Sequence, residues 1–141
     1  MIKVKVIASG RCKEEWLRMA LAEYEKRLSP FLEITWIHPK DDAQLADLLP
    51  QEQQYIALDP NGDSMGSLEF SQKLLKYFEN NRSRATFAIG GPDGFSPDIL
   101  QKSTLRWSLS PLTFTHQLTR LILLEQIYRA MEISKKSPYH K

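Results

Sequence analysis

The stretch ATFAIGGPDGFSP, residues 85–97, decides the fold class of this chain. Residues 85–90 are apolar and predict a buried strand, and Gly90 to Gly94 predict a tight turn at its carboxyl end. Ser96-Pro97 predicts a helix start, because serine caps free backbone N–H groups and proline fits the first helical turn. A strand followed by a glycine turn and a helix is typical of α/β proteins, in which such turns approach ligands.

The same alternation of strands and helices extends in both directions from this stretch. Strands are predicted at residues 2–8, 32–38, 54–59, 85–90 and 105–110. Helices are predicted at 13–28, 68–80, 96–103 and about 115–134, with a short helix or turn at 41–50. Several strands are apolar throughout, which predicts an α/β fold: a mainly parallel sheet with helices on both faces. No linker or repeat interrupts the pattern, so residues 1–141 are expected to form one domain.

Helical periodicity indicates which side chains face the core. The helix 13–28 is expected to bury Trp16, Leu17, Ala20, Leu21, Tyr24 and Leu28. The helix 68–80 is expected to begin at a cap formed by Ser64 or Ser67 and to turn Phe70, Leu74, Leu75 and Phe78 inward. The last helix is apolar almost all round, which predicts that a second layer or a second subunit covers it.

Composition places the chain among soluble proteins of a reducing compartment. Cys12 is the only cysteine, which excludes an intrachain disulfide. The segment MIKVKVIASG alternates charged and apolar residues, unlike a signal peptide, and no run of about 18 apolar residues is present. We therefore expect a cytoplasmic protein without a membrane segment.

The charge is unevenly distributed along the chain. Residues 95–141 hold seven Lys/Arg against three Asp/Glu, a net charge of +4, whereas residues 1–94 hold twelve against fourteen, or −2. A second basic cluster near the start contains Lys3, Lys5, Arg11 and Lys13. Two basic ends on a near-neutral body suit a nucleic-acid backbone, although solvated surface lysines give the same pattern.

The glycine turn is poorly suited to a phosphate. Its order does not match G-x-G-x-x-G, Pro92 has no N–H to donate, and Asp93 adds a negative charge. No G-K-[ST] follows a glycine loop anywhere. These absences disfavour a nicotinamide- or flavin-binding domain. Two interpretations of the turn remain: it binds a ligand that lacks phosphate and tolerates a nearby carboxylate, or it is a tight turn that binds no ligand.

The last helix and the tail after it carry the remaining polar groups of interest. Glu125 and Arg129 are four residues apart, the spacing of an ordinary helical ion pair or of a pair at an interface. In the tail SPYHK, Tyr139 suits stacking on a base, His140 suits proton transfer near neutral pH, and Lys141 suits contact with phosphate. A disordered end is the alternative.

Four strings of the sequence together resemble one protein family. They are YIALDPNGDSMGSLEF, FAIGGPDGF, SLSPLTFTHQLTRLILLEQIYRA and SPYHK, in this order along nearly the whole chain. The chain is similar to the bacterial rRNA large-subunit methyltransferases that methylate N3 of a pseudouridine in 23S rRNA, in the SPOUT or α/β-knot superfamily.

The resemblance implies a carboxy-terminal trefoil knot, an obligate homodimer, S-adenosylmethionine as cofactor and no metal. It also implies a cofactor pocket at three predicted strand ends, formed by Leu58, Gly90, Gly91, Leu109, Ser110, Pro111, Leu112, Thr113 and Phe114.

Methylation of the imide nitrogen requires loss of its proton, because the neutral N3–H is a poor nucleophile. From residue type and family position, His140 of the partner's tail is the first candidate base, with His116 as the alternative acceptor. Tyr139 is expected to pack on or orient the base, and Arg129 to stabilise the developing negative charge. A small basic enzyme is expected to act on assembled ribosomes. A SPOUT enzyme for another RNA site and a non-catalytic RNA-binding dimer are the other hypotheses.

Overall fold

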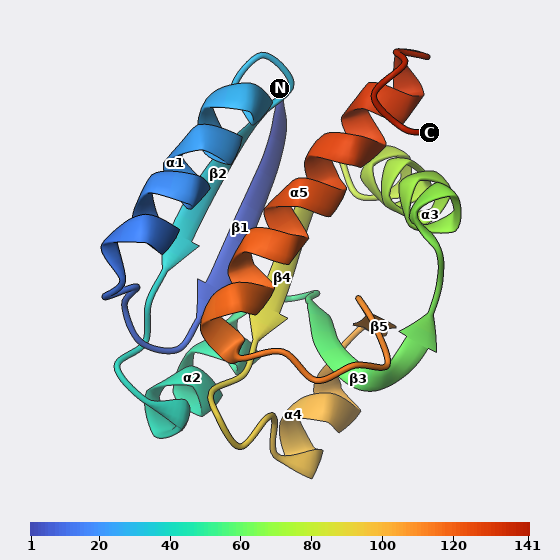
Figure 1. Cartoon of the computed structure of the whole chain (residues 1–141). Coiled ribbons are helices and arrows are strands. Elements are labelled where there is room, and N and C mark those ends of the chain that lie inside the picture. The colour runs from blue at the N-terminus through green and yellow to red at the C-terminus, as the bar shows by residue number, and fades with distance from the viewer.

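The computed structural model describes residues 1–141 and contains one sheet of five parallel strands. Their order is β2-β1-β4-β3-β5, and all pairs are parallel (Figure 1). The strands are β1 (Ile2–Ala8), β2 (Leu32–Ile37), β3 (Ile56–Ser64), β4 (Arg84–Ile89) and β5 (Leu105–Ser108). The predicted α/β fold with a mainly parallel sheet is confirmed. The knot stays a prediction.

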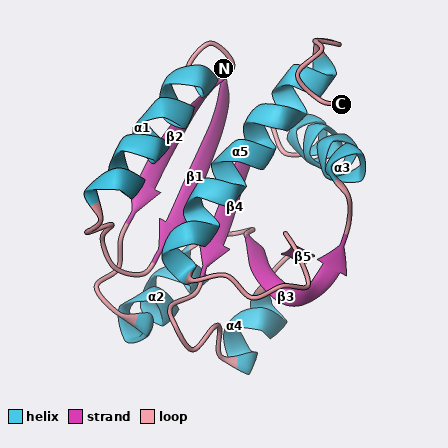
Figure 2. Cartoon of the chain, in the orientation of Figure 1, coloured by secondary structure: helices cyan, strands magenta, loops and turns pink.

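Helices occupy the connections between the strands (Figure 2). They are α1 (Glu15–Leu28), α2 (Asp42–Leu48), the short 3-10 turn η1 (Leu49–Gln51), α3 (Ser67–Asn80), α4 (Pro97–Lys102) and α5 (His116–Ser134). Side chains cap three of them: Asp41 accepts from the Gln44 N–H, Ser96 from Ile99 and Thr115 from Leu118. The predicted cap of α3 is wrong, because Gly66 holds that position and Ser67 is already helical. The Ser67 hydroxyl instead donates to Gln126 Oε1 on α5, at 2.7 Å.

Alternate residues of β1 face two separate apolar cores. Val4, Val6 and Ala8 belong to the larger core, which α1, α3 and α5 cover in the front of Figure 1. Ile7 points the other way, into a smaller core closed by Leu45 of α2 and by residues of η1 and α4. This alternation follows the two-residue period of a strand, and it explains why helices lie on both faces of the sheet.

The second face is covered only along its carboxyl half. Side chains of the amino half of β2, β1 and β4 are exposed or half-buried on that side: Lys3, Lys5, Glu33, Thr35, Arg84 and Thr86. Lys5 forms an ion pair of 2.9 Å with Glu52. The sequence therefore predicted the presence of helices on this face but not that half of it stays open.

Strand β3 is longer than predicted. Its pairing with β5 shifts register between Leu58 and Asp63, so the polar segment DPNGDS bulges and then rejoins the sheet. Gly62 permits this because a Cβ there would lie 2.7 Å from the Arg106 carbonyl. The prediction for the first helix was wrong at Trp16, which is 58% exposed, whereas Leu17 and Leu21 are buried.

Helix α5 lies between α1 and α3 across the front of the sheet (Figure 1). Its inner residues are fully buried, among them Leu123, Leu124 and Ile127. The remaining apolar residues of this helix, such as Leu118 and Ile122, are half-buried in the single chain. Packing within the single chain therefore explains only part of the apolar surface of α5. None of the helices is long and apolar enough to cross a membrane.

Candidate functional site

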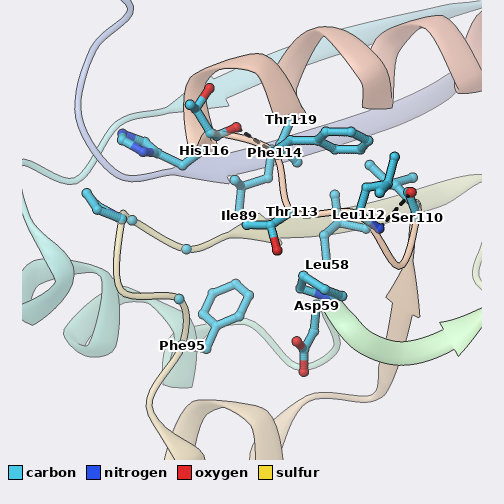
Figure 3. Close-up of a pocket in the computed structure, with 17 residues that line it drawn as sticks. Leu58, Asp59, Ile89, Phe95, Ser110, Leu112, Thr113, Phe114, His116 and Thr119 are labelled. Carbon is cyan, nitrogen blue, oxygen red and sulfur yellow. Dashed lines mark hydrogen bonds between the residues drawn. The ribbon is translucent and has the colours of Figure 1, made fainter.

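A pocket of about 590 Å³ opens beyond the carboxyl ends of β4 and β5 and beside the bulge of β3 that follows Leu58. This is the position where parallel α/β sheets bind ligands, and the volume suits a small molecule. Three segments form most of its wall: residues 58–60, 89–95 and 109–116. Figure 3 shows Phe95 and Thr113 facing the space from opposite sides. Parallel strands bring these segments together because all their carboxyl ends lie at one edge.

The glycine turn after β4 is closed tightly on itself. A Cβ on Gly90 would lie 2.9 Å from the Gly94 carbonyl carbon, closer than side chains approach backbone. The Gly94 N–H donates to the Gly91 carbonyl at 3.0 Å, and Gly94 has a φ of +73°, which favours glycine. The turn therefore has no room for a side chain at Gly90, and it lines the pocket with glycine backbone.

The segment between β5 and α5 forms the opposite wall through its own hydrogen bonds. The Ser108 hydroxyl donates to the Ser110 carbonyl at 2.9 Å, and the Ser110 hydroxyl accepts from the Leu112 N–H at 3.0 Å. Leu112 is 70% exposed, so an apolar side chain stands at the rim of the pocket. These local bonds shape the loop before any ligand is present.

Charge in the pocket disfavours an anionic ligand. Asp59 is the only carboxylate among the lining residues, and no lysine or arginine lines the space. His116 lines it as well, and burial, helped by the nearby Arg120 cation, lowers the pKa of its imidazole. His116 is therefore neutral at neutral pH. A neutral or cationic small molecule with apolar parts fits this set of groups.

The second group of interest is the tail cluster, made of Glu125, Arg129, Tyr139 and His140. The Glu125 carboxylate accepts a 3.0 Å hydrogen bond from the Tyr139 hydroxyl and a 3.3 Å bond from Arg129 Nε. Arg129 Nη1 lies 3.1 Å from Nδ1 of His140, and its guanidinium lies 4.8 Å from the centre of the Tyr139 ring. The tail is therefore held against α5 rather than free.

Burial in the tail cluster has an electrostatic consequence. Loss of solvent, followed by the neighbouring Glu125 carboxylate, raises the pKa of the Tyr139 phenol well above its usual range. The phenol thus stays protonated and acts as a hydrogen-bond donor at neutral pH. Its ring also packs edge-on against Tyr128, with the ring centres 4.9 Å apart.

A family model described as "Predicted SPOUT methyltransferase" matches residues 2–140 of the chain. The chain belongs to the SPOUT methyltransferase family. The resemblance found in the sequence is thereby confirmed, and the pocket at the bulge of β3 and the ends of β4 and β5 lies in a SPOUT fold.

Individual relatives agree with this family. A protein of Protochlamydia amoebophila named "Ribosomal RNA large subunit methyltransferase H" is 47% identical over 141 residues, the whole of both chains. Proteins of the same name from Dictyoglomus thermophilum and Acetivibrio thermocellus are 39% and 35% identical, each over 99% of this chain and 99% and 100% of their own. A putative methyltransferase of Legionella pneumophila, solved with its bound cofactor SAM, shares the fold with a TM-score of 0.54 and 10% identity. That match covers 92% of this chain and 66% of the other.

The structure brings together most of the residues expected at the cofactor site. The pocket is lined by Leu58, Gly90, Gly91, Leu109, Ser110, Leu112, Thr113 and Phe114, whereas Pro111 is not among the lining residues. Sequence reasoning missed Phe95 and Thr119, which also line it. Phe95 directly follows the glycine turn in the sequence, and this position could have indicated that its side chain lies at the pocket.

The four candidate catalytic residues do not meet within one chain. His116 lies at the first turn of α5, beside the pocket, whereas Arg129 and the tail lie at the other end of this helix (Figure 1). Thirteen residues at 1.5 Å per residue separate His116 from Arg129 by about 20 Å. The carboxylate of Glu125, which bonds both Arg129 and Tyr139, had been singled out only as a partner of Arg129. No group of three or more His, Cys, Asp and Glu side chains is placed to hold a metal.

Proposed function

We propose that the chain is an S-adenosylmethionine-dependent methyltransferase that methylates N3 of a pseudouridine in 23S rRNA on assembled ribosomes. The observation that carries the proposal is a pocket at the strand ends of a SPOUT fold, with a glycine turn, one carboxylate and no cationic side chain to bind phosphate. Relatives that match the chain over its whole length and are named for rRNA methylation support the choice of substrate.

The residues of the pocket fit this cofactor. S-adenosylmethionine has no phosphate, and when bound it supplies an electrophilic methyl group on a positively charged sulfur. The backbone of Gly90 and Gly91 and the loop from Leu109 to Phe114 would hold it. Asp59 adds the one negative charge, which favours a cation in this space.

The other groups that the reaction needs lie in the tail cluster. When Arg129 turns from Nδ1 of His140 to the base, it stabilises the negative charge that develops there and frees this nitrogen to accept the N3 proton. Tyr139 packs on the base. His116 stays as the alternative proton acceptor, because it is neutral and lies at the pocket. A single chain separates the tail cluster from its own pocket by about 20 Å.

A homodimer resolves this separation by placing the tail cluster of one subunit at the pocket of the other. The half-buried apolar residues of α5, such as Leu118 and Ile122, leave apolar surface for such an interface. Trp16 and Met19 of α1, 58% and 67% exposed, add to the apolar surface. A two-fold dimer contains two equivalent composite sites. In the cell the enzyme meets its ribosomes in the cytoplasm.

The test is transfer of labelled methyl from S-adenosylmethionine to ribosomes that lack this methyl group. Ribosomes that also lack the pseudouridine serve as control, and naked 23S rRNA tests the need for assembly. The proposal expects label on the first substrate only. Label on both kinds of ribosome points to another RNA site, and equal or faster labelling of naked rRNA contradicts action on assembled ribosomes. A protein that binds the RNA but transfers no label is the non-catalytic alternative.

Mixed dimers test the composite site directly. A chain with Thr113→Trp fills its pocket with the indole ring, and a chain with His140→Ala loses the candidate base of its tail, so each homodimer is expected to be inactive. Subunits exchanged between the two form heterodimers with one intact pocket and one intact tail that face each other. Random exchange therefore restores about a quarter of wild-type activity. No recovery, after exchange has been demonstrated, contradicts the composite site.

A further inference from the structure

Arg120 of α5 is fully buried, yet no carboxylate bonds it. Its Nη2 donates to the carbonyl oxygens of Ser9 and Gly10, at 2.7 and 2.6 Å, where β1 ends. Its Nε and Nη1 have no partner. A buried cation with incomplete hydrogen bonding costs stability, so packing alone does not explain an arginine at this place.

The contacts continue from Ser9 to the glycine turn. The Ser9 hydroxyl, 6% exposed, donates to Oδ1 of Asp42 at 3.2 Å. Asp42 begins α2, and its carboxylate lies directly against Gly91, where an added Cβ would be 2.7 Å from Oδ1. Arg120, Ser9 and Asp42 thus connect α5 and the end of β1 with the turn that follows β4. We call these three residues the strut.

A second cavity adjoins the glycine turn, between this turn and α2. It measures about 380 Å³ and is bounded by α2 and by residues of the turn, including Asp93, Gly94 and Phe95. Gly94 and Phe95 line both this cavity and the pocket. The turn is therefore not packed from both sides, and a shift toward the cavity would widen the pocket.

We propose that Arg120, Ser9 and Asp42 are positioning residues that fix Gly91 and thereby set the width of the cofactor pocket. None of the three lines the pocket, so they act through the glycine turn rather than by touching the cofactor. The Arg120 guanidinium holds the end of β1, Ser9 orients the Asp42 carboxylate, and the carboxylate supports Gly91 from the side opposite the ligand. The inference rests on the proposed function for the identity of the ligand only.

The first test compares Ser9→Ala with Ser71→Ala, which removes another buried hydroxyl, bonded to the Ala130 carbonyl. Both variants are expected to lose similar thermal stability. Titration calorimetry with S-adenosylmethionine should show binding about five- to tenfold weaker for Ser9→Ala, the effect of one partly buried hydrogen bond to a carboxylate, and unchanged for Ser71→Ala. Equal affinities of the two variants would overturn the proposal.

The second test is a double-variant cycle. Gly91→Ala places a methyl group 2.7 Å from Oδ1 of the exposed Asp42, which must rotate away and give up its bond from Ser9, so cofactor binding should weaken about five- to tenfold in the wild-type background. In an Asp42→Ala background the methyl group finds room, so the same change should cost little further affinity. An equal loss of affinity in both backgrounds contradicts support of Gly91 by Asp42.

Amide hydrogen exchange separates failure of this inference from failure of the proposed function. In the cofactor-free protein, Ser9→Ala should speed exchange of the Gly94 amide, whose bond closes the turn, and Ser71→Ala should not. If wild-type protein fails to bind S-adenosylmethionine, the proposed function is wrong. The exchange rate of the Gly94 amide still shows whether the strut holds the glycine turn, because it is measured without cofactor. An unchanged Gly94 rate in Ser9→Ala refutes the strut whatever the ligand.

Discussion

Replacing Gly90 with alanine tests whether the glycine turn is built for backbone alone. The new Cβ would lie 2.9 Å from the Gly94 carbonyl carbon and 3.1 Å from its oxygen. Both contacts are with backbone of the same turn, so neither can be relieved by a side-chain rotation. The turn must open or remain strained.

The size of the effect follows from the cost of overpacking, about 1–3 kcal/mol. If the cofactor-free turn stays closed, this strain lowers the free energy of unfolding, and Tm falls by about 3–10 °C. If the turn opens, the strain is avoided in the free protein and appears as weaker cofactor binding, by between about five- and 150-fold. The loss in free energy of unfolding and the loss in binding free energy together should equal the strain energy.

Gly66→Ala is the matched control, because a Cβ at this position meets nothing within 4 Å. Gly66 is the residue before α3. Alanine there lowers the entropy of the unfolded chain, which stabilises the fold, but it caps the helix less well, which destabilises it. The free energy of unfolding should therefore stay within about 1 kcal/mol of wild type. Thermal unfolding and calorimetric titration with S-adenosylmethionine measure both quantities. If Gly90→Ala matches Gly66→Ala in both, the turn has room for a side chain and the reasoning fails.

Two further predictions concern His116 and the tail. Because burial and Arg120 lower the pKa of His116, the unfolded chain binds a proton at a higher pH than the folded chain, and stability should fall as pH drops below about 6.5. In urea unfolding measured at several pH values, His116→Gln should reduce this loss of stability at low pH. A smaller loss should remain, because burial also lowers the pKa of His38. If the loss is unchanged in His116→Gln, His116 does not cause it. Tyr139→Phe removes the bond to Glu125 and should speed exchange of the Tyr139 amide by up to about tenfold. No change would mean that ring packing on Tyr128 holds the tail.

Much of the fold was accessible from the sequence because local patterns determined it. The apolar strands, the Ser96 cap and the end of β4 at the glycine turn depend on neighbours within a few residues. The extension of β3 was not accessible, since Asp59 to Gly62 have turn composition and continue the strand only because β5 lies beside them. Trp16 was predicted to be buried because periodicity shows which residues share a helix face, but it does not show how far along the helix other elements cover that face.

The contacts that shape the site depend on the tertiary fold. Arg120 bonds Ser9 across 111 residues of sequence, and Ser9 bonds Asp42 across 33. No local spacing indicates either contact. The tail shows the same limit: its residue types suggested chemistry, but only the structure shows that Tyr139 and Arg129 share the Glu125 carboxylate.

Nucleotide-resolved mass spectrometry shows whether the protein methylates one nucleotide of 23S rRNA. Ribosomes that lack the methyl group are incubated with S-adenosylmethionine and wild-type protein, and the rRNA is digested to nucleosides and short fragments. We expect one added methyl group, located on N3 of a pseudouridine, and none when S-adenosylmethionine is left out. A methyl group on another base or on a ribose, with the pseudouridine unmodified, would contradict this expectation.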